Sequence, residues 1–254
     1  IYGPTYLPRK FKTGIGLHGD NAADIYSQDL GLLAICENWN IVGYNVLVGG
    51  GFGVTPSAKK TFPAIAQPMA FITPEQVIDV ATAIVKVQRD FGNRSDRKVA
   101  RLKYLIHNWG LDRFKEKVEE YYGHQLQPPR PVVVEDINDG LGWHPQGDGR
   151  WFYGLNVEDG RIKDEGEFRL KTALRQICHE LRPSMRLTPH QGIIFCELEE
   201  SERGRLEEIL RVHGVPLSED ISQSRRWSMA CPALPTCGLA ITESERALPE
   251  LLEE

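Results

Sequence analysis

The spacing of apolar side chains predicts a block of helices in the first half of the chain. The string Thr73-Pro-Glu-Gln76 is typical of a capped helix start, and apolar residues then recur at helical spacing as far as Gly92. Two further helices are expected, one over residues 95–109 and one over about 112–122, and a glycine follows each. Three successive helices predict a helical layer.

Strand-like segments precede these helices. A segment that runs to about Leu17, and apolar runs at residues 32–36 and 42–48, have the length and composition of strands. Residues 37–40 join the last two strands, which predicts a hairpin in an antiparallel sheet. Together with the helices, these strands predict an α+β fold.

The pattern changes after Gln127-Pro-Pro-Arg-Pro131, a proline-rich string that cannot continue a helix and is predicted to be a linker. Beyond it the expected order is strand, helix, two strands and helix, which suits an α+β unit of the ferredoxin-like type. These elements are expected at residues 151–157, 169–181, 185–188, 192–196 and 201–213.

The composition agrees with a folded globular protein and narrows its class. Of the 254 residues, 41% are hydrophobic, which is enough for a core. The net charge of -5 argues against a general nucleic-acid binder. No apolar run reaches the roughly 18 to 20 residues of a membrane span, and no signal peptide opens the chain. We therefore expect neither nucleic acid nor a membrane as a partner.

The five cysteines are too few and too scattered for the disulfide framework of a secreted protein, which favours a reducing compartment. Cys36, Cys178 and Cys196 lie within apolar runs and are predicted to be small core residues. Cys231 and Cys237 lie six positions apart on a proline-rich loop, and two close thiolates are typical ligands of an iron-sulfur cluster or a zinc ion. Two unrelated buried cysteines are the alternative.

Two groups of basic residues could bind an anion. Lys10 and Lys12 are two positions apart, so an extended backbone would project both ammonium groups to one side. Arg94, Arg97 and Arg101 would share one face of the second predicted helix. The alternative in both cases is a solvated basic surface.

Four glycines in the string Val48-Gly-Gly-Gly-Phe-Gly53 would let the backbone approach a bulky ligand closely. No Gly-Lys-Ser/Thr follows, so the string is not a nucleotide phosphate loop, and a simple glycine-rich turn is the alternative. The seven histidines form no H-E-x-x-H or H-x3-H pair, and no G-x-S-x-G is present. A hydrolase or a histidine zinc site is therefore not expected.

Four strings of the sequence resemble the assimilatory sulfite reductase haemoprotein family, the sulfite and nitrite reductases that carry sirohaem and a [4Fe-4S] cluster. The strings are Leu7–Lys12, Asn93–Tyr104, Arg186–Gly192 and Met229–Cys237. The resemblance extends from Ile1 to Arg246. It implies the mixed sheet, the helical layer and the ferredoxin-like half-unit of that fold.

The resemblance also implies roles for individual side chains. Lys10 and Lys12 would point at sulfite bound to sirohaem, neutralise it and relay protons as its oxygens leave as water. Cys231 and Cys237 would be the first cysteine pair of the [4Fe-4S] cluster. The residues expected to contact the cofactor or its substrate are Arg9, Gly49, Gly50, Gly51, Arg97, Arg101, Lys103 and Gln191.

The activity implied by the resemblance is the six-electron reduction of sulfite to hydrogen sulfide in sulfate assimilation. Ferredoxin would deliver electrons to the cluster, and the sirohaem would pass them to sulfur. Trp143-His144 and Gly147-Asp-Gly149 are more similar to the ferredoxin-dependent branch than to the NADPH-linked one. A nitrite reductase of the same family is the alternative, in which an asparagine usually replaces Lys12. The expected location is the cytoplasm, or the plastid stroma in a plant or alga.

The sequence departs from the family pattern in two respects. The family's later C-x3-C pair, which includes the axial ligand of sirohaem, and its amino-terminal half are not among these 254 residues. We therefore expect a central fragment, incomplete at both ends and inactive alone, whose partners include the other parts of the enzyme. A catalytically inactive homologue that binds a partner is the alternative. The expected domains are a sirohaem-domain segment (1–126), a ferredoxin-like half-domain (127–217) and the start of the [4Fe-4S]/sirohaem domain (218–254).

Overall fold

The chain forms two compact units, residues 1–138 and 139–254. The structure is a computed structural model that describes residues 1–38, 40–55, 57–132, 134–135, 137–238 and 240–252. Each unit has a hydrophobic core of its own. Within the described residues, no helix has the length and apolar character needed to cross a membrane.

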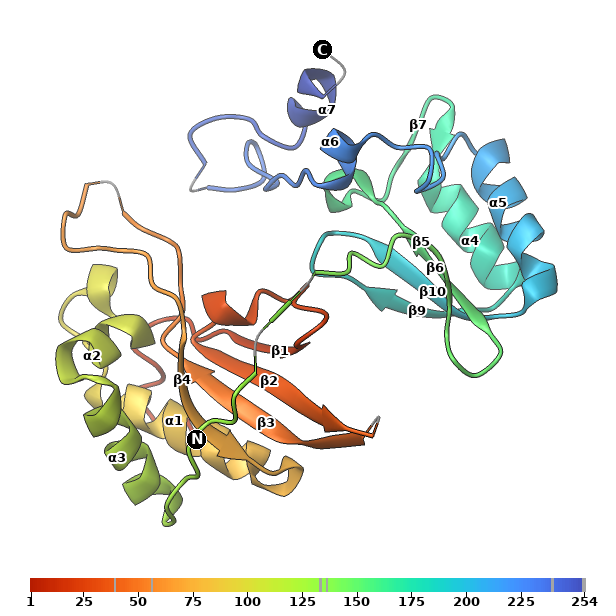
Figure 1. Cartoon of the computed structure of the whole chain (residues 1–254). Coiled ribbons are helices and arrows are strands. Elements are labelled where there is room, and N and C mark those ends of the chain that lie inside the picture. Colours follow the sequence, from red (N-terminus) through yellow and green to blue (C-terminus); the bar gives the residue numbers. More distant parts are fainter. Residues whose placement is uncertain (39, 56, 133, 136, 239, 253–254) are drawn as a thin grey trace. The chain divides into compact units, whose positions relative to one another are not determined.

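A four-stranded mixed sheet forms the centre of the first unit (Figure 1). β1 is parallel to β2, and the other neighbouring strands are antiparallel. The predicted hairpin is therefore confirmed as β2 and β3, although residue 39 in its turn lies outside the described residues. In order across the sheet, the strands are β1 (Thr13–Leu17), β2 (Leu30–Glu37), β3 (Asn40–Val48) and β4 (Gln67–Ile72).

Three helices cover one face of this sheet (Figure 1). A 3-10 turn, η2 (Pro74–Gln76), precedes the first helix, and Gln76 Oε1 accepts a hydrogen bond from the Thr73 N–H at 2.9 Å, as predicted for a capping box. Val80 and Ile84 of the first helix are fully buried against the strands. The helices are α1 (Val77–Phe91), α2 (Leu102–Trp109) and α3 (Leu111–Tyr122).

The second helix is shorter than predicted. Instead of one helix over 95–109, the structure has a 3-10 turn, η3 (Arg97–Val99), and then α2. Arg101 precedes α2 with an extended backbone (φ -75°, ψ 159°), and the carbonyl of Ala100 accepts a hydrogen bond from Gln88 Nε2 at 2.8 Å. Because the helix is interrupted there, the prediction that three arginines share one helix face is wrong.

The segment that carries the two lysines lies beside the start of β2. β1 begins at Thr13, so Lys10 and Lys12 precede it. The Leu30 N–H donates to the Lys12 carbonyl at 3.1 Å, which attaches this segment to β2. Between β1 and β2 lies a 3-10 turn, η1 (Ile25–Ser27), and Ile25 belongs to a small core of its own.

Residues after α3 pack against the first unit rather than extending freely. The Phe71 N–H donates to the Gln127 carbonyl at 2.9 Å. Asn45, which is buried, donates to the Arg130 carbonyl at 2.7 Å and accepts from the Arg130 N–H at 2.9 Å. The first compact unit therefore extends to residue 138, and the domain boundary expected at residue 126 stays a prediction.

An antiparallel sheet with two packed helices forms the second unit (Figure 1). Its strand order is β5-β6-β10-β9, and Tyr153, Phe195 and Leu206 lie in its core. The strands are β5 (Gly142–Pro145), β6 (Trp151–Leu155), β9 (Ser184–Leu187) and β10 (Ile193–Leu198), with a small pair β7 (Asp164–Glu165) and β8 (Phe168–Arg169). The other elements are η4 (Glu158–Gly160), α4 (Leu170–Glu180), η5 (Glu200–Glu202), α5 (Arg203–Val212), α6 (Gln223–Arg226) and α7 (Leu248–Leu251).

The three cysteines predicted to be core residues differ in burial. Cys196 in β10 is buried, as predicted. Cys36 and Cys178 are exposed. Cys36 lies near the outer end of β2, where the strand extends beyond the core and its burial decreases. Apolar neighbours in sequence therefore did not establish burial for these two positions.

Candidate anion-binding site

A buried carboxylate brings the lysine segment and the second helix together. The Asp29 side chain, just before β2, is wholly buried. Its Oδ1 accepts from Arg101 Nε at 3.2 Å, and its Oδ2 accepts from Arg101 Nη2 at 2.8 Å and from the Lys12 N–H at 2.9 Å. A buried carboxylate is costly unless it is paired in this way. The pairing places Arg101 beside Lys12.

Like charges surround the ammonium group of Lys12. Its pKa is lowered from the usual lysine value, first by partial burial and then by the positive charges of Arg101 and Lys10. The negative charge of Asp29 opposes this effect and is the smallest of these contributions. An anion placed among these cations would relieve their repulsion.

A cavity of ≈ 400 Å³ opens next to this cluster. Five cationic side chains line it, and no carboxylate is among the described residues that do so. Four of the five form no ion pair within the described part of the chain, Arg101 being the exception. Such a surface attracts anions. The lining residues are Arg9, Lys10, Arg97, Lys98 and Arg101, together with Gly53, Val54, Thr55, Thr61 and Tyr104.

The glycine-rich loop is close-packed against the chain itself. A Cβ on Gly49 would lie 2.9 Å from Ile106 Cδ1, and one on Gly51 would lie 2.4 Å from Arg101 Nη1. A Cβ on Gly50 would lie 2.2 Å from the Tyr26 carbonyl oxygen. All three glycines are buried. The glycines therefore allow this loop to approach α2 and the Arg101 guanidinium, a reason that the string alone did not reveal.

Lys103 is held inside the protein by the same loop. Its side chain is almost wholly buried, and its ammonium donates to the carbonyls of Gly51 at 2.9 Å, Gly53 at 3.0 Å and Phe62. Its pKa is lowered, chiefly by burial and then by Arg101. An ammonium has three N–H donors, so these carbonyls use them all. Lys103 thus fastens both ends of the segment 53–62, part of which lines the cavity.

The predicted residues of the second unit lie around the proline-rich loop. Gln191 adopts a positive φ of 65°, and its Nε2 donates to the Ala230 carbonyl at 3.0 Å. Its Oε1 is buried and has no hydrogen-bond partner among the described residues. The contact ties the turn before β10 to the residue that precedes Cys231.

The two loop cysteines have free thiols, with Cys231 exposed and Cys237 partly exposed. No group of three or more histidine, cysteine, aspartate or glutamate side chains is arranged for a metal ion within the part of the chain that the structure describes. A [4Fe-4S] cluster takes four thiolate ligands. This pair of thiols is therefore insufficient to hold one by itself.

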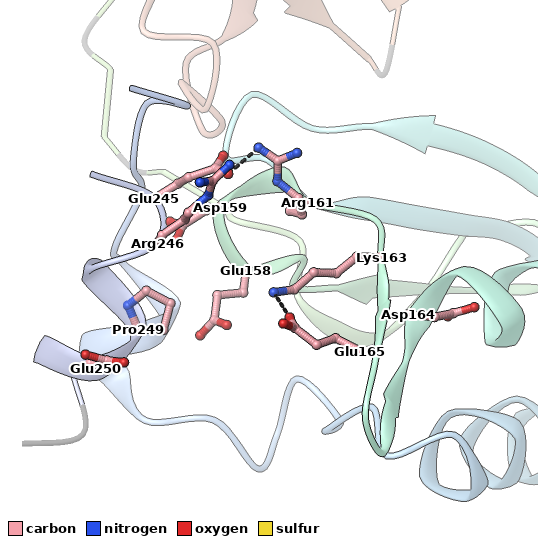
Figure 2. Close-up of a pocket in the computed structure, with 10 residues that line it drawn as sticks. All are labelled: Glu158, Asp159, Arg161, Lys163, Asp164, Glu165, Glu245, Arg246, Pro249 and Glu250. Atoms are coloured by element: carbon pink, nitrogen blue, oxygen red, sulfur yellow. Dashed lines mark hydrogen bonds and ion pairs between the residues drawn. The ribbon is translucent and has the colours of Figure 1, made fainter. Parts of the chain in front are cut away.

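A larger cavity of ≈ 630 Å³ lies in the second unit, but its charges do not favour an anion (Figure 2). Arg161 pairs with Glu245, and Lys163 pairs with Glu165 (Figure 2). Further carboxylates line this cavity, and the pKa of Asp159 among them is raised by burial and by neighbouring acidic groups. The cations here are neutralised by the chain itself, so the cavity of the first unit is the better candidate.

Sequence reasoning missed Asp29, and it counted Lys98 among the basic residues of the second predicted helix without giving it a role in the site. Lys98 lines the cavity beside the predicted Arg97. Asp29 is a single acidic residue before an apolar run, and only its position directly before the buried part of β2 (residues 30–34) is unusual. Its partner is 72 positions away, so no local pattern could have identified their contact.

Fold and site define an α+β protein with a basic cavity suited to an anionic ligand. Residues 1–126 match a family model described as the nitrite and sulphite reductase 4Fe-4S domain. Residues 144–213 match the nitrite/sulfite reductase ferredoxin-like half domain. The chain belongs to the nitrite and sulfite reductase family, which confirms the resemblance inferred from its motifs, and the ferredoxin-like part of the predicted fold is also confirmed.

Individual relatives agree with this assignment. The chain is 46% identical over 253 residues to a sulfite reductase [ferredoxin] of Synechococcus elongatus, covering 99% of this chain and 40% of that protein. It is 44% identical over 254 residues to a sulfite reductase [NADPH] hemoprotein beta-component of Geobacillus thermodenitrificans, and the match covers 100% of this chain and 44% of that protein. The NirA protein of Mycobacterium tuberculosis has a similar structure, with a TM-score of 0.82 and 27% identity, and the match covers 100% of this chain and 45% of that one. The chain thus spans less than half the length of these relatives.

Proposed function

We propose that the basic cavity of the first unit binds carboxylates of sirohaem, and that the chain supplies this part of the active site of a sulfite reductase. The observation that carries the proposal is the cavity itself, which five cations line without a carboxylate among the described residues. Sirohaem is a tetrapyrrole with carboxylates around its rim. Each close contact between such a carboxylate and a guanidinium contributes roughly a few kcal/mol of Coulomb energy before desolvation is subtracted.

Different cations have different parts in this proposal. Arg9, Arg97 and Arg101 bind carboxylates of the macrocycle. The guanidinium groups of Arg9 and Arg97 can form paired hydrogen bonds with them, and Arg101 donates from Nη1, because its other donors are in use. Lys10 and Lys12 bind sulfite. The lowered pKa of Lys12 makes its ammonium a better proton donor, which suits a reaction in which the oxygens of sulfite leave as water. Bound sirohaem and its cluster would carry electrons from the external donor to sulfite.

The remaining predicted residues keep a proposed role near the cofactors. The backbone of Gly49, Gly50 and Gly51 lets the chain approach the macrocycle, and Gln191 contacts its edge. Lys103 contributes through the loop that it fastens, because its three donors are in use. The [4Fe-4S] cluster needs four thiolate ligands. Cys231 and Cys237 provide one pair, and the second pair comes from polypeptide outside these 254 residues.

Ferredoxin is the proposed electron donor, in the cytoplasm or in a plastid stroma. Relatives named for ferredoxin and for NADPH both resemble the chain at similar identity. Nitrite is the alternative substrate, since the descriptions of both matching family models name nitrite beside sulfite. Lys12 favours sulfite, because an asparagine at this position is the pattern of the nitrite enzymes.

Titration of the 254-residue chain with uroporphyrin I, an octacarboxylate porphyrin, tests the proposal. We expect saturable binding that added salt weakens, and about a tenfold loss of affinity in each of Arg97→Gln and Arg101→Gln. Arg211→Gln is the matched control, because Arg211 is exposed in the second unit and pairs with Asp220 at 3.3 Å. Equal affinity of all four proteins would refute the proposed site.

A further inference from the structure

Asp29 and the Gly50 carbonyl use all the donors of the Arg101 guanidinium except those of Nη1. Nε and Nη2 of Arg101 donate to Asp29, and Nη2 also donates to the Gly50 carbonyl at 3.2 Å. Among the described residues, the Nη1 hydrogens have no hydrogen-bond partner. Nη1 lies against Gly51, where a Cβ would be only 2.4 Å away, and the Arg101 side chain lines the cavity. The guanidinium is thus held through Nε and Nη2, while its Nη1 group remains available to an anion.

The same carboxylate fixes the backbone that carries Lys12. Oδ2 of Asp29 accepts from the Lys12 N–H at 2.9 Å, and the next residue, Leu30, donates its N–H to the Lys12 carbonyl at 3.1 Å. Both backbone groups of Lys12 are therefore held by two consecutive residues. Since Asp29 itself is wholly buried and directly precedes the core strand β2, it is a rigid support for the cations on either side of it.

We propose that Asp29 is a positioning residue of the anion site, which holds the Arg101 guanidinium so that its free Nη1 group faces the bound anion beside Lys12. This inference rests on the proposed function, because it assumes that the cavity binds an anion. Asp29 does not touch the ligand. It acts through Arg101, and the two matching hydrogen bonds set the plane of the guanidinium.

The sign of the charge separates this role from a general electrostatic one. A negative charge beside a cationic site weakens anion binding by charge alone, so removal of Asp29 would then strengthen binding. If Asp29 positions Arg101, its removal weakens binding instead. In Asp29→Asn, the amide oxygen can still accept from the Lys12 N–H, but the amide nitrogen cannot accept from Arg101.

Uroporphyrin I binding to the 254-residue chain distinguishes a positioning role of Asp29 from a purely electrostatic one. We expect Asp29→Asn to bind at least about tenfold more weakly than the unsubstituted chain. Asp79→Asn, the same change of charge at an exposed position of α1, should bind within about twofold of the unsubstituted chain. Equal or tighter binding by Asp29→Asn overturns the inference but leaves the proposed function intact. Failure of the unsubstituted chain to bind overturns both.

A pH titration adds a readout that a loss of folding does not mimic. The charge of Asp29 raises the pKa of Lys12, so its removal lowers that pKa, and the loss of binding at alkaline pH should move to lower pH in Asp29→Asn. If the pH midpoint of this loss is the same in Asp29→Asn and in the unsubstituted chain, Asp29 does not act on Lys12. If Asp29→Asn does not fold, Arg101→Gln is compared with the double variant Asp29→Asn/Arg101→Gln, which lacks the buried charge pair. If these two variants bind uroporphyrin I with affinities within about threefold of each other, Asp29 acts through Arg101. A difference of about tenfold overturns the inference.

Discussion

Two basic side chains only two positions apart have different surroundings. Arg101 and Lys103 are both positive and both lie in a string that resembles a cofactor-binding segment. Arg101 lines the cavity, and part of its guanidinium has no hydrogen-bond partner among the described residues. The Lys103 ammonium, in contrast, donates hydrogen bonds to three carbonyls of a neighbouring loop. Residue type and spacing predicted that a cluster of cations would exist. Which cation is available to a ligand depends on acceptors that lie elsewhere in the chain.

At the same scale, Lys12 should give anion binding a pH dependence. Its folded-state pKa is lowered, so it loses its positive charge at a lower pH than an ordinary lysine does. We expect uroporphyrin I affinity to fall as the pH rises through this lowered pKa, because the charge of Lys12 lies near Arg101, a proposed carboxylate contact, and adds to the positive potential there. Lys12→Arg should remove that part of the fall, because arginine stays protonated.

Lys171→Arg, an exposed site of the second unit, is the control and should keep the original pH profile. Titrations from neutral to alkaline pH at constant ionic strength provide the measurement. If Lys12→Arg keeps the same alkaline loss as the unsubstituted chain, Lys12 is not the group that titrates.

Among elements, the interruption between η3 and α2 decides the form of the site. The sequence has helical spacing through residues 95–109, yet the backbone is extended at Arg101. Gln88 of α1 binds the Ala100 carbonyl, and Asp29 binds the Arg101 side chain. These contacts compensate for the helical hydrogen bonds that the interruption forgoes. Local helix propensity could not predict this interruption, because Gln88 and Asp29 lie in other elements of the chain.

The loop fastened by Lys103 should depend on that one side chain. Lys103→Met keeps an unbranched apolar stem but leaves three carbonyls without their donor, which should destabilise the fold by roughly 2 to 4 kcal/mol. We also expect faster amide hydrogen exchange in residues 57–62. Lys98→Met is the control for stability, because Lys98 is exposed. Similar denaturation midpoints for the two variants would show that the loop does not need this ammonium.

For the whole molecule, the two cores indicate two units that can be studied separately. The first unit includes residues 127–135, which bind β4 through Gln127, β3 through Arg130 and the residue after β1 through Glu135. A proline-rich string is typical of a linker, and no pattern in the sequence indicates these contacts. They involve backbone groups and a buried asparagine far away in sequence.

Truncation tests where the first unit ends. A chain of residues 1–138 should fold and retain uroporphyrin I binding, because all the cavity residues belong to it. A chain of residues 1–126 should be less stable by at least about 2 kcal/mol, since it leaves Asn45 buried without its partners. Thermal and urea unfolding compare the two. Equal stability would support the boundary at residue 126.

The sequence alone determined the α+β class, the family, the presence of a cation-rich segment and much of the order of the elements, but it did not predict β4 or β5. These follow from local periodicity and from short strings whose residue types are read directly. The tertiary structure alone decided that Asp29 pairs with Arg101, that Lys103 is enclosed, and that the glycines make room for neighbouring side chains. Each of these depends on groups distant in sequence that folding brings within a few ångströms, where hydrogen bonds and steric contact act.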